Sequence, residues 1–158
     1  MEARIFATKG EMGAAAAAAG AEKIREALAD CGEARIVMAS AASQFEVVEA
    51  LTRESDIAWE GVTLFHLDEY IGISADHPAS FSRFLRERFV ARLPGKLKAF
   101  HAIEGENEAR MECVRMGRVL AGEAPVVAFI GIGENGHIAF NDPPADFETG
   151  EPYLVVEL

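Results

Sequence analysis

Residues 126–144, VVAFIGIGENGHIAFNDPP, read as a buried strand that runs into a glycine-rich turn. The apolar run at its start predicts a strand over residues 126–132. The turn then brings an imidazole, a carboxylate and two amides within eight positions, at Asn135, His137, Asn141 and Asp142. An imidazole and a carboxylate just beyond a buried strand are well suited to proton transfer. The stretch thus predicts both a sheet element and a candidate site.

The same turn matches the dinucleotide-binding pattern GxGxxG at Gly131, Gly133 and Gly136. That pattern binds a pyrophosphate only where the turn opens a helix whose N-terminus receives the anion. Pro143 and Pro144 follow within eight residues of the last glycine and leave little room for such a helix. No acidic residue ends a second strand about 20 positions further on, where a ribose would need it. We therefore expect no bound nucleotide.

Outward from this stretch, helical and strand-like segments alternate along the chain. Two capping boxes, Thr8 with Glu11 and Ser43 with Glu46, predict helix starts. Helices are expected over residues 8–30, 43–52, 81–90 and 107–120, and strands over residues 35–39, 62–67, 126–132 and 154–158. Strands separated by ten to twenty helical residues indicate an α/β fold, an open, mainly parallel Rossmann-like sheet with helices on both faces. No linker or repeat divides the chain, so residues 1–158 are expected to form one α/β domain.

Polar clusters follow three of these strands, at residues 40–43, 68–70 and 133–142. In open parallel sheets, ligands bind beyond the carboxyl ends of the strands, so the three clusters are expected to converge. Ser40, Ala41, Ala42 and Ser43 lie between a strand and a helix start, where backbone N–H groups favour a phosphate. Capping of the helix by Ser43 explains the same residues equally well, and both readings stay open.

Asp68, Glu69 and Tyr70 come directly after an apolar strand. A carboxylate there can be partly desolvated, which raises its pKa and makes it a useful base. A solvated turn is the alternative for an isolated DEY sequence. His66 reads as a hydrogen-bonded core histidine, and His77 and His101 are given no role.

His137 differs from the other histidines because a carboxylate and amides surround it in the sequence. Asp142 could hold its imidazole and Asn135 could hydrogen-bond nearby. The histidines lack metal-binding spacing, and no serine lies in a GxSxG sequence. Acid/base catalysis without a metal or cofactor is the remaining chemistry.

The amino-acid composition limits which kinds of molecule the protein is expected to bind. The formal charge of −11 argues against nucleic acid and anionic membranes, but a small anionic substrate needs only a few local donors. Cys31 and Cys113 are isolated and fit reduced, buried thiols of a cytoplasmic protein. No signal peptide or membrane-spanning run is expected.

Two long motifs closely resemble the glucosamine-6-phosphate deaminase/isomerase family. They are FHLDEYIGI with HPASF, at residues 65–73 and 77–81, and GIGENGHIAFNDP, at residues 131–143. Residues 40–51, SAASQFEVVEAL, fall where that family has its phosphate loop. The related 6-phosphogluconolactonases share the fold, but their motifs look like DER and GHTASLFP where this chain has DEY and GHIAFNDP.

The resemblance implies a reversible aldose–ketose isomerisation that releases ammonia and gives fructose 6-phosphate, without a cofactor. By position, Asp68 would move a proton from C2 to C1, and His137 would assist ring opening with support from Asn135 and Asp142. Residues Ser40 to Ser43 would receive the phosphate. With Glu69, Gly133 and Gly136 they complete the expected substrate-binding set. The oligomeric state is left open, a homo-oligomer included.

The chain departs from the family pattern at several positions. Asn135 stands where an aspartate is usual and Asp142 where a glutamate is usual, and the phosphate loop has alanines for glycines. The chain also stops inside an expected strand, so it is expected to be the N-terminal portion of a longer family fold. These departures motivate an alternative, a sugar-phosphate-binding sensor without turnover. A lactonase is a further alternative that the motifs disfavour.

Overall fold

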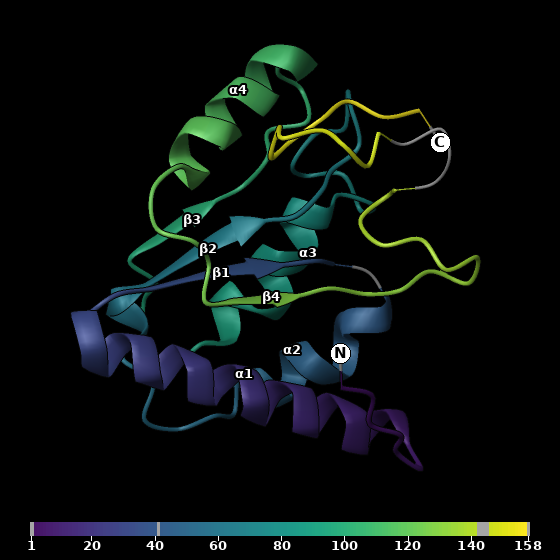
Figure 1. Ribbon diagram of the computed structural model, residues 1–158. Coiled ribbons are helices and arrows are strands. Elements are labelled where there is room, and N and C mark those ends of the chain that lie inside the picture. The colour runs from purple at the N-terminus through teal and green to yellow at the C-terminus, as the bar shows by residue number, and fades with distance from the viewer. Residues whose placement is uncertain (1, 41, 142–145, 158) are drawn as a thin grey trace.

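The computed structural model describes residues 2–40, 42–141 and 146–157. Its centre is a four-stranded parallel sheet in the order β3-β2-β1-β4 (Figure 1). The strands are β1 (Ala34–Met38), β2 (Val62–His66), β3 (Ala99–His101) and β4 (Val127–Phe129). In the register, Ile36 of β1 lies opposite Leu64 of β2 and Val127 of β4. The expected α/β fold with a parallel sheet is confirmed.

Helix α1 (Lys9–Cys31) begins and ends where the sequence predicts. The Thr8 side chain accepts a hydrogen bond from the Glu11 backbone, and the Glu11 side chain accepts one from the Thr8 backbone, which completes the capping box. Gly32 ends the helix with a φ of 77°, a conformation that glycine adopts at little cost.

The small residues of α1 let it approach its neighbours closely. A Cβ on Gly13 would lie 2.4 Å from the Cβ of Glu46, and one on Gly20 would lie 2.2 Å from Cζ of Phe129. This alanine-rich helix therefore packs closely against Glu46 and Phe129, because both glycine positions exclude any side chain.

The second capping box does not form. A short 3-10 turn, η1 (Ala42–Gln44), precedes α2 (Phe45–Leu51), and Gln44 at the helix start makes no side-chain cap. Ser43 lies inside that 3-10 turn, one residue too early to cap the helix. The prediction of a cap at Ser43 is thus wrong, and the helix begins two residues later than expected.

The remaining helical segments cover the sheet. They are η2 (Trp59–Gly61), α3 (Phe81–Arg88), η3 (Val90–Arg92) and α4 (Ala109–Leu120). Buried residues of α1, α2 and α3 share one apolar cluster with the sheet, and α4 lies over the opposite face (Figure 1). Both faces are thus covered, as a parallel sheet requires.

Arg35 joins α4 to this opposite face. Its guanidinium donates to carbonyl oxygens at the end of the helix, at 2.9 Å to Val119 and 2.7 Å to Leu120. It also lies 4.8 Å from the ring centre of Phe65. One half-buried cation therefore satisfies otherwise unpaired helix carbonyls.

Three strand expectations need correction. The strand after residue 126 is only β4, because the chain turns back at once and Ile132 forms an antiparallel bridge with Ile138. Residues 154–157 are not in a strand, since no described strand offers them a ladder of hydrogen bonds. Strand β3, which contains His101, was missed because three residues carry too little periodicity to detect.

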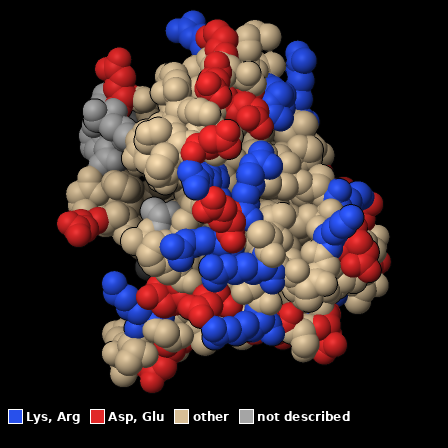
Figure 2. Space-filling view, turned by 180° about the vertical axis from the view of Figure 1, so that it is seen from behind, with Lys and Arg blue, Asp and Glu red and all other residues tan. Residues whose placement is uncertain are grey.

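The two cysteines are free, but Cys31 is exposed and Cys113 half-buried, so the expectation of buried thiols is wrong. Acidic and basic side chains are interspersed over the face that Figure 2 shows. Ion pairs such as Arg25 with Glu54, at 2.7 Å, link neighbouring elements. Within the described ranges, no helix is both long and apolar enough to cross a membrane.

Candidate active site

The carboxyl ends of β1, β2 and β4 lie at one edge of the sheet because the three strands are parallel neighbours. Backbone hydrogen bonds continue past the strands, from Ala39 N to the Phe129 carbonyl at 2.9 Å and from Leu67 N to the Met38 carbonyl at 3.3 Å. The loops that carry the three polar clusters therefore start side by side.

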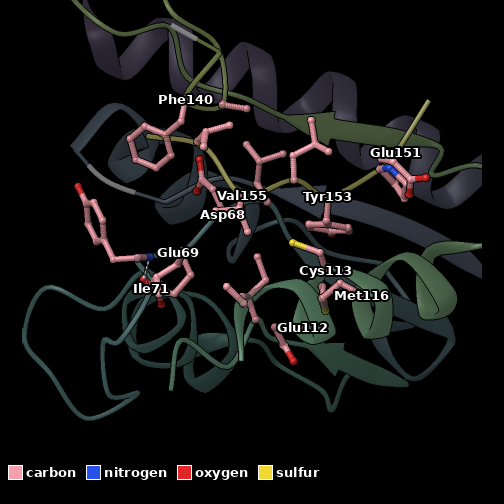
Figure 3. Close-up of a pocket in the computed structure, with 18 of the residues that line it drawn as sticks. Asp68, Glu69, Ile71, Glu112, Cys113, Met116, Phe140, Glu151, Tyr153 and Val155 are labelled. Atoms are coloured by element: carbon pink, nitrogen blue, oxygen red, sulfur yellow. Dashed lines mark hydrogen bonds between the residues drawn. The ribbon is translucent and has the colours of Figure 1, made fainter. Parts of the chain in front are cut away.

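Asp68 lies in a pocket of about 500 Å³, a size typical of small-molecule sites. Figure 3 shows its carboxylate in the pocket, together with Phe140, Val155 and Tyr153. Burial raises the pKa of Asp68 to about 6, with a further rise from neighbouring Glu69 and an opposing effect from His137. The pKa effect of His137 shows that the two groups interact electrostatically. This is a carboxylate matched to proton transfer near neutral pH.

Glu69 also lines the pocket, but its carboxylate is held by the start of α3. It accepts hydrogen bonds from the Ser80 hydroxyl at 2.8 Å, the Ser82 N–H at 2.9 Å and the Phe81 N–H at 3.2 Å. The Phe81 and Ser82 donors are free N–H groups of a helix N-terminus, which favour a negative charge. Glu69 thereby fixes the loop that presents Asp68.

The turn around His137 is held by backbone hydrogen bonds. Asn135 Oδ1 accepts from the His137 N–H at 3.2 Å, and the Gly133 N–H donates to the His137 carbonyl at 2.9 Å. Gly136 has a φ of 88°, which favours glycine. A Cβ on Gly133 would lie 2.5 Å from Cε1 of His137, so the imidazole packs directly on this backbone. The glycines thus shape the turn and seat the ring.

No helix follows this turn over residues 137–141, which removes the anion site that a nucleotide fingerprint needs. The expectation against a nucleotide rested on Pro143 and Pro144, which lie outside the described residues. The described part of the turn supports the same conclusion independently.

Phe140 is a site residue that sequence reasoning missed. Its ring centre lies 5.8 Å from that of His137, 5.9 Å from that of Tyr70 and 6.1 Å from that of Phe81. Phe140 and the preceding Ala139 both have a φ of 55°, and such left-handed residues are costly outside glycine. In the sequence, the position of Phe140 only three residues after His137 was the one indication that its ring could belong to the site.

The loop after β1 lies beside the His137 turn. A Cβ on Gly131 would lie 2.3 Å from Oγ of Ser43, so the two loops touch. Ser40 and Gln44 are buried, and within the described chain Ser40 Oγ and Gln44 Oε1 have no hydrogen-bond partner. Ala42 lies in the 3-10 turn η1.

The predicted site residues fall into two groups. Asp68 and Glu69 line the pocket. A second group, outside that lining, lies around the touching Gly131 and Ser43 loops: Ser40, Ala42, Ser43, Gly133, Asn135, Gly136 and His137. The electrostatic interaction of Asp68 with His137 connects the two groups. Ala41 and Asp142 lie outside the described residues.

The C-terminal segment, residues 146–156, supplies pocket residues that the sequence did not indicate. Tyr153 Oη donates a hydrogen bond to the His66 carbonyl at 2.8 Å. Burial raises the pKa of Tyr153 to about 12, so its phenol stays neutral. Cys113 and Met116 of α4 complete this side of the pocket (Figure 3).

His66, His77 and His101 also lie outside the pocket lining. His66 is fully buried, accepts a hydrogen bond from the Ile103 N–H at 3.4 Å, and has its pKa lowered by burial to about 3. The interpretation of His66 as a core histidine is confirmed. Over the described ranges, no cluster of three or more His, Cys, Asp or Glu residues could hold a metal.

Residues 7–156 match the family of glucosamine-6-phosphate isomerases and 6-phosphogluconolactonases. The chain belongs to this family. It is 32% identical over 128 residues to the glucosamine-6-phosphate deaminase of Streptococcus pneumoniae serotype 4, a match that covers 81% of this chain and 54% of that protein. The chain spans about half the length of the curated relatives it matches.

Solved structures agree on the fold. A monomeric glucosamine-6-phosphate deaminase superposes with a TM-score of 0.85 at 26% identity, over 94% of this chain and 62% of its own. The 6-phosphogluconolactonase of Trypanosoma brucei superposes with a TM-score of 0.71 at 22% identity, over 89% of this chain and 62% of its own, which shows the shared fold alone. The family resemblance read from residues 65–81 and 131–143 is confirmed.

Proposed function

We propose that the protein isomerises and deaminates an amino-sugar phosphate, converting glucosamine 6-phosphate to fructose 6-phosphate and ammonia. The observation that carries this proposal is the burial of the Asp68 carboxylate in a sugar-sized pocket, which raises its pKa to about 6 against an opposing effect of His137. The similarity of the chain to curated glucosamine-6-phosphate deaminases also supports this proposal.

In this proposal Asp68 is the base. Its pKa lies just below neutral pH, so the carboxylate is mostly ionised and still basic enough to take a proton from C2 of the open-chain sugar and return it at C1. His137 assists opening of the pyranose ring by moving a proton at the ring oxygen. Asn135 supports it by accepting from its backbone N–H, and Asp142 is proposed as the acidic partner of the imidazole.

The phosphate is proposed to bind at residues Ser40, Ala41, Ala42 and Ser43. Two observations support this: the buried Ser40 hydroxyl, and the contact of Ser43 with Gly131, next to the His137 turn. Backbone N–H groups and hydroxyls at such a loop suit a phosphate. Glu69, Gly133 and Gly136 complete the substrate-binding set as residues that shape it: Glu69 by fixing the Asp68 loop, and the glycines by fixing the His137 turn.

The test is ammonia release from glucosamine 6-phosphate by the protein expressed from its complete gene. We expect turnover in the wild type, and a loss of about 10²–10⁴-fold in kcat for Asp68→Asn, because that is the typical contribution of a general base. Asp76→Asn, which changes an exposed carboxylate, is the matched control and should keep wild-type turnover.

Two further measurements, of melting temperature and of lactone hydrolysis, separate the alternatives. A sensor would show a substrate-dependent rise in melting temperature without ammonia, because ligand binding stabilises the folded state. A lactonase would hydrolyse 6-phosphogluconolactone and leave glucosamine 6-phosphate unchanged. Either result would overturn the proposed deaminase activity.

A further inference from the structure

We propose that Tyr153 is a positioning residue that anchors residues 149–156 as one wall of the Asp68 pocket and shields the Asp68 carboxylate from solvent. The proposal deepens the proposed function and rests on it where catalysis is concerned. Residues 149–156 form neither helix nor strand, so specific contacts must hold them beside Asp68.

The segment is anchored at two neighbouring residues. Tyr153 Oη donates to the His66 carbonyl at 2.8 Å, at the carboxyl end of β2 and two residues before Asp68. Pro152 packs on α4, where a Cβ on Gly117 would lie 3.3 Å from Pro152 Cγ. The hydrogen bond fixes the segment to the sheet and the packing fixes it to the helix, so the chain bridges the two across the pocket.

Beyond these anchors the segment contributes an apolar wall. Leu154, Val155 and Val156 follow Tyr153 and line the same pocket as Asp68 (Figure 3). All three are exposed, so each has one side towards the pocket and another towards solvent. Apolar side chains in this position exclude water from Asp68, and exclusion of water disfavours the charged form of a carboxyl group.

Three other charged or titratable groups act on Asp68 or on Tyr153. Glu69 raises the pKa of Asp68 and His137 lowers it, while burial is the largest effect. Arg115 of α4 acts on Tyr153 and is paired with Glu112. Because the Tyr153 hydroxyl donates to a main-chain carbonyl, it acts on the reaction through the placement of Asp68 and the wall.

The direct test is a ¹³C NMR titration of the Asp68 carboxyl group in the protein expressed from its complete gene. In the wild type we expect a pKa near 6. Tyr153→Ala should lower it towards the ordinary value of 3.8, because water reaches the carboxylate. Tyr153→Phe keeps the ring and loses only the hydrogen bond, so it should give a smaller change in the same direction.

A second pair of variants tests the other anchor, the packing of Pro152 on α4. Gly117→Val places methyl groups against Pro152 and should displace the segment, lowering the pKa of Asp68 without altering Tyr153. Gly117→Ala adds only the Cβ, 3.3 Å from Pro152, and should change the titration much less. Phe147→Ala, at a side chain that is 71% exposed and just before the segment, is the control and should leave the titration unchanged.

An unaltered pKa of Asp68 in both Tyr153→Ala and Gly117→Val would overturn the proposal. If Tyr153→Ala does not fold, Tyr153→Phe and Gly117→Val decide the same question. The acidic limb of the kcat profile should follow the titration, moving to lower pH in each displaced variant. Because the titration needs no substrate, a protein that releases no ammonia but shows these shifts would refute the proposed function and leave the role of Tyr153 standing.

Discussion

Replacing Asp68 by asparagine is expected to stabilise the fold, and to do so more at pH 8 than at pH 5. The pKa of Asp68 is about 6 in the folded protein against an ordinary 3.8. Between these values the folded state binds more protons than the unfolded state, so wild-type stability falls as pH rises through this window. Asparagine has nearly the same shape and does not titrate, so the variant loses this pH-dependent penalty.

The magnitude follows from the two pKa values. One pKa unit corresponds to about 1.4 kcal/mol, so the ionised carboxylate costs the fold up to about 3 kcal/mol at pH 8 and about 1.6 kcal/mol at pH 5. The advantage of Asp68→Asn should therefore grow by about 1.4 kcal/mol between the two conditions. This gain in stability should accompany the loss of turnover, as at other strained catalytic sites.

The assay is urea unfolding of wild type, Asp68→Asn and the exposed control Asp76→Asn at pH 5 and pH 8. We expect the first variant to diverge from wild type as pH rises, and the control to follow wild type. If Asp68→Asn is equally or less stable than wild type at both pH values, then the carboxylate is not destabilised by burial, and the basis for its proposed role as a base is lost.

Three further substitutions test the packing around the site. Gly20→Val should lower stability by about 2 kcal/mol in urea unfolding, because even a Cβ there lies 2.2 Å from the Phe129 ring of β4. Arg35→Ala should cost about 2 kcal/mol and speed hydrogen exchange in the last turn of α4, since the carbonyls there lose their donor. Glu112→Gln should cost about 2 kcal/mol at pH 7, because the hydrogen-bonded Arg115 holds the pKa of Glu112 at about 2. That stabilisation is present above the ordinary pKa of 4.5 and is lost as pH falls towards 2, so the difference from wild type should shrink below pH 4.5.

Each of these expectations can be contradicted by its own measurement. A Gly20→Val protein with unchanged stability would mean that α1 can move away from β4 at no cost. Unchanged hydrogen exchange in Arg35→Ala would show that water replaces the guanidinium at the helix end. A Glu112→Gln difference that stays constant from pH 7 to pH 3 would rule out ionisation of Glu112 as its source.

The parallel sheet was predictable because strands separated by helices leave few other arrangements. The capping box at Thr8 was also predictable, since both of its hydrogen bonds join residues three positions apart. The identical signal at Ser43 failed. There the chain leaves β1 through a 3-10 turn, with Ser43 against Gly131 and Gln44 buried, so contacts with a distant loop outweigh the local preference.

Site residues that lie in a sequence motif could be predicted, whereas those whose contacts are with distant parts of the chain could not. Asp68 and His137 lie in two recognisable motifs at strand ends. Tyr153 has no local signal, because its partner is a main-chain carbonyl at His66. Residues 154–157 have strand-like composition, but composition cannot supply a neighbouring strand to pair with.

Strands β1 and β4 are neighbours in space, although β2, α3, β3 and α4 separate them along the chain. Pairing of such distant segments is slow, because the entropy of closing a long loop is lost before any stabilising contact forms. Asp68 follows β2 and His137 follows β4, so a folding intermediate with only β1 and β2 paired has the carboxylate without its imidazole. The loops that carry Asp68 and His137 are therefore brought together by the longest-range pairing of the sheet, so a partly folded chain emerging from the ribosome would lack the proposed acid/base pair.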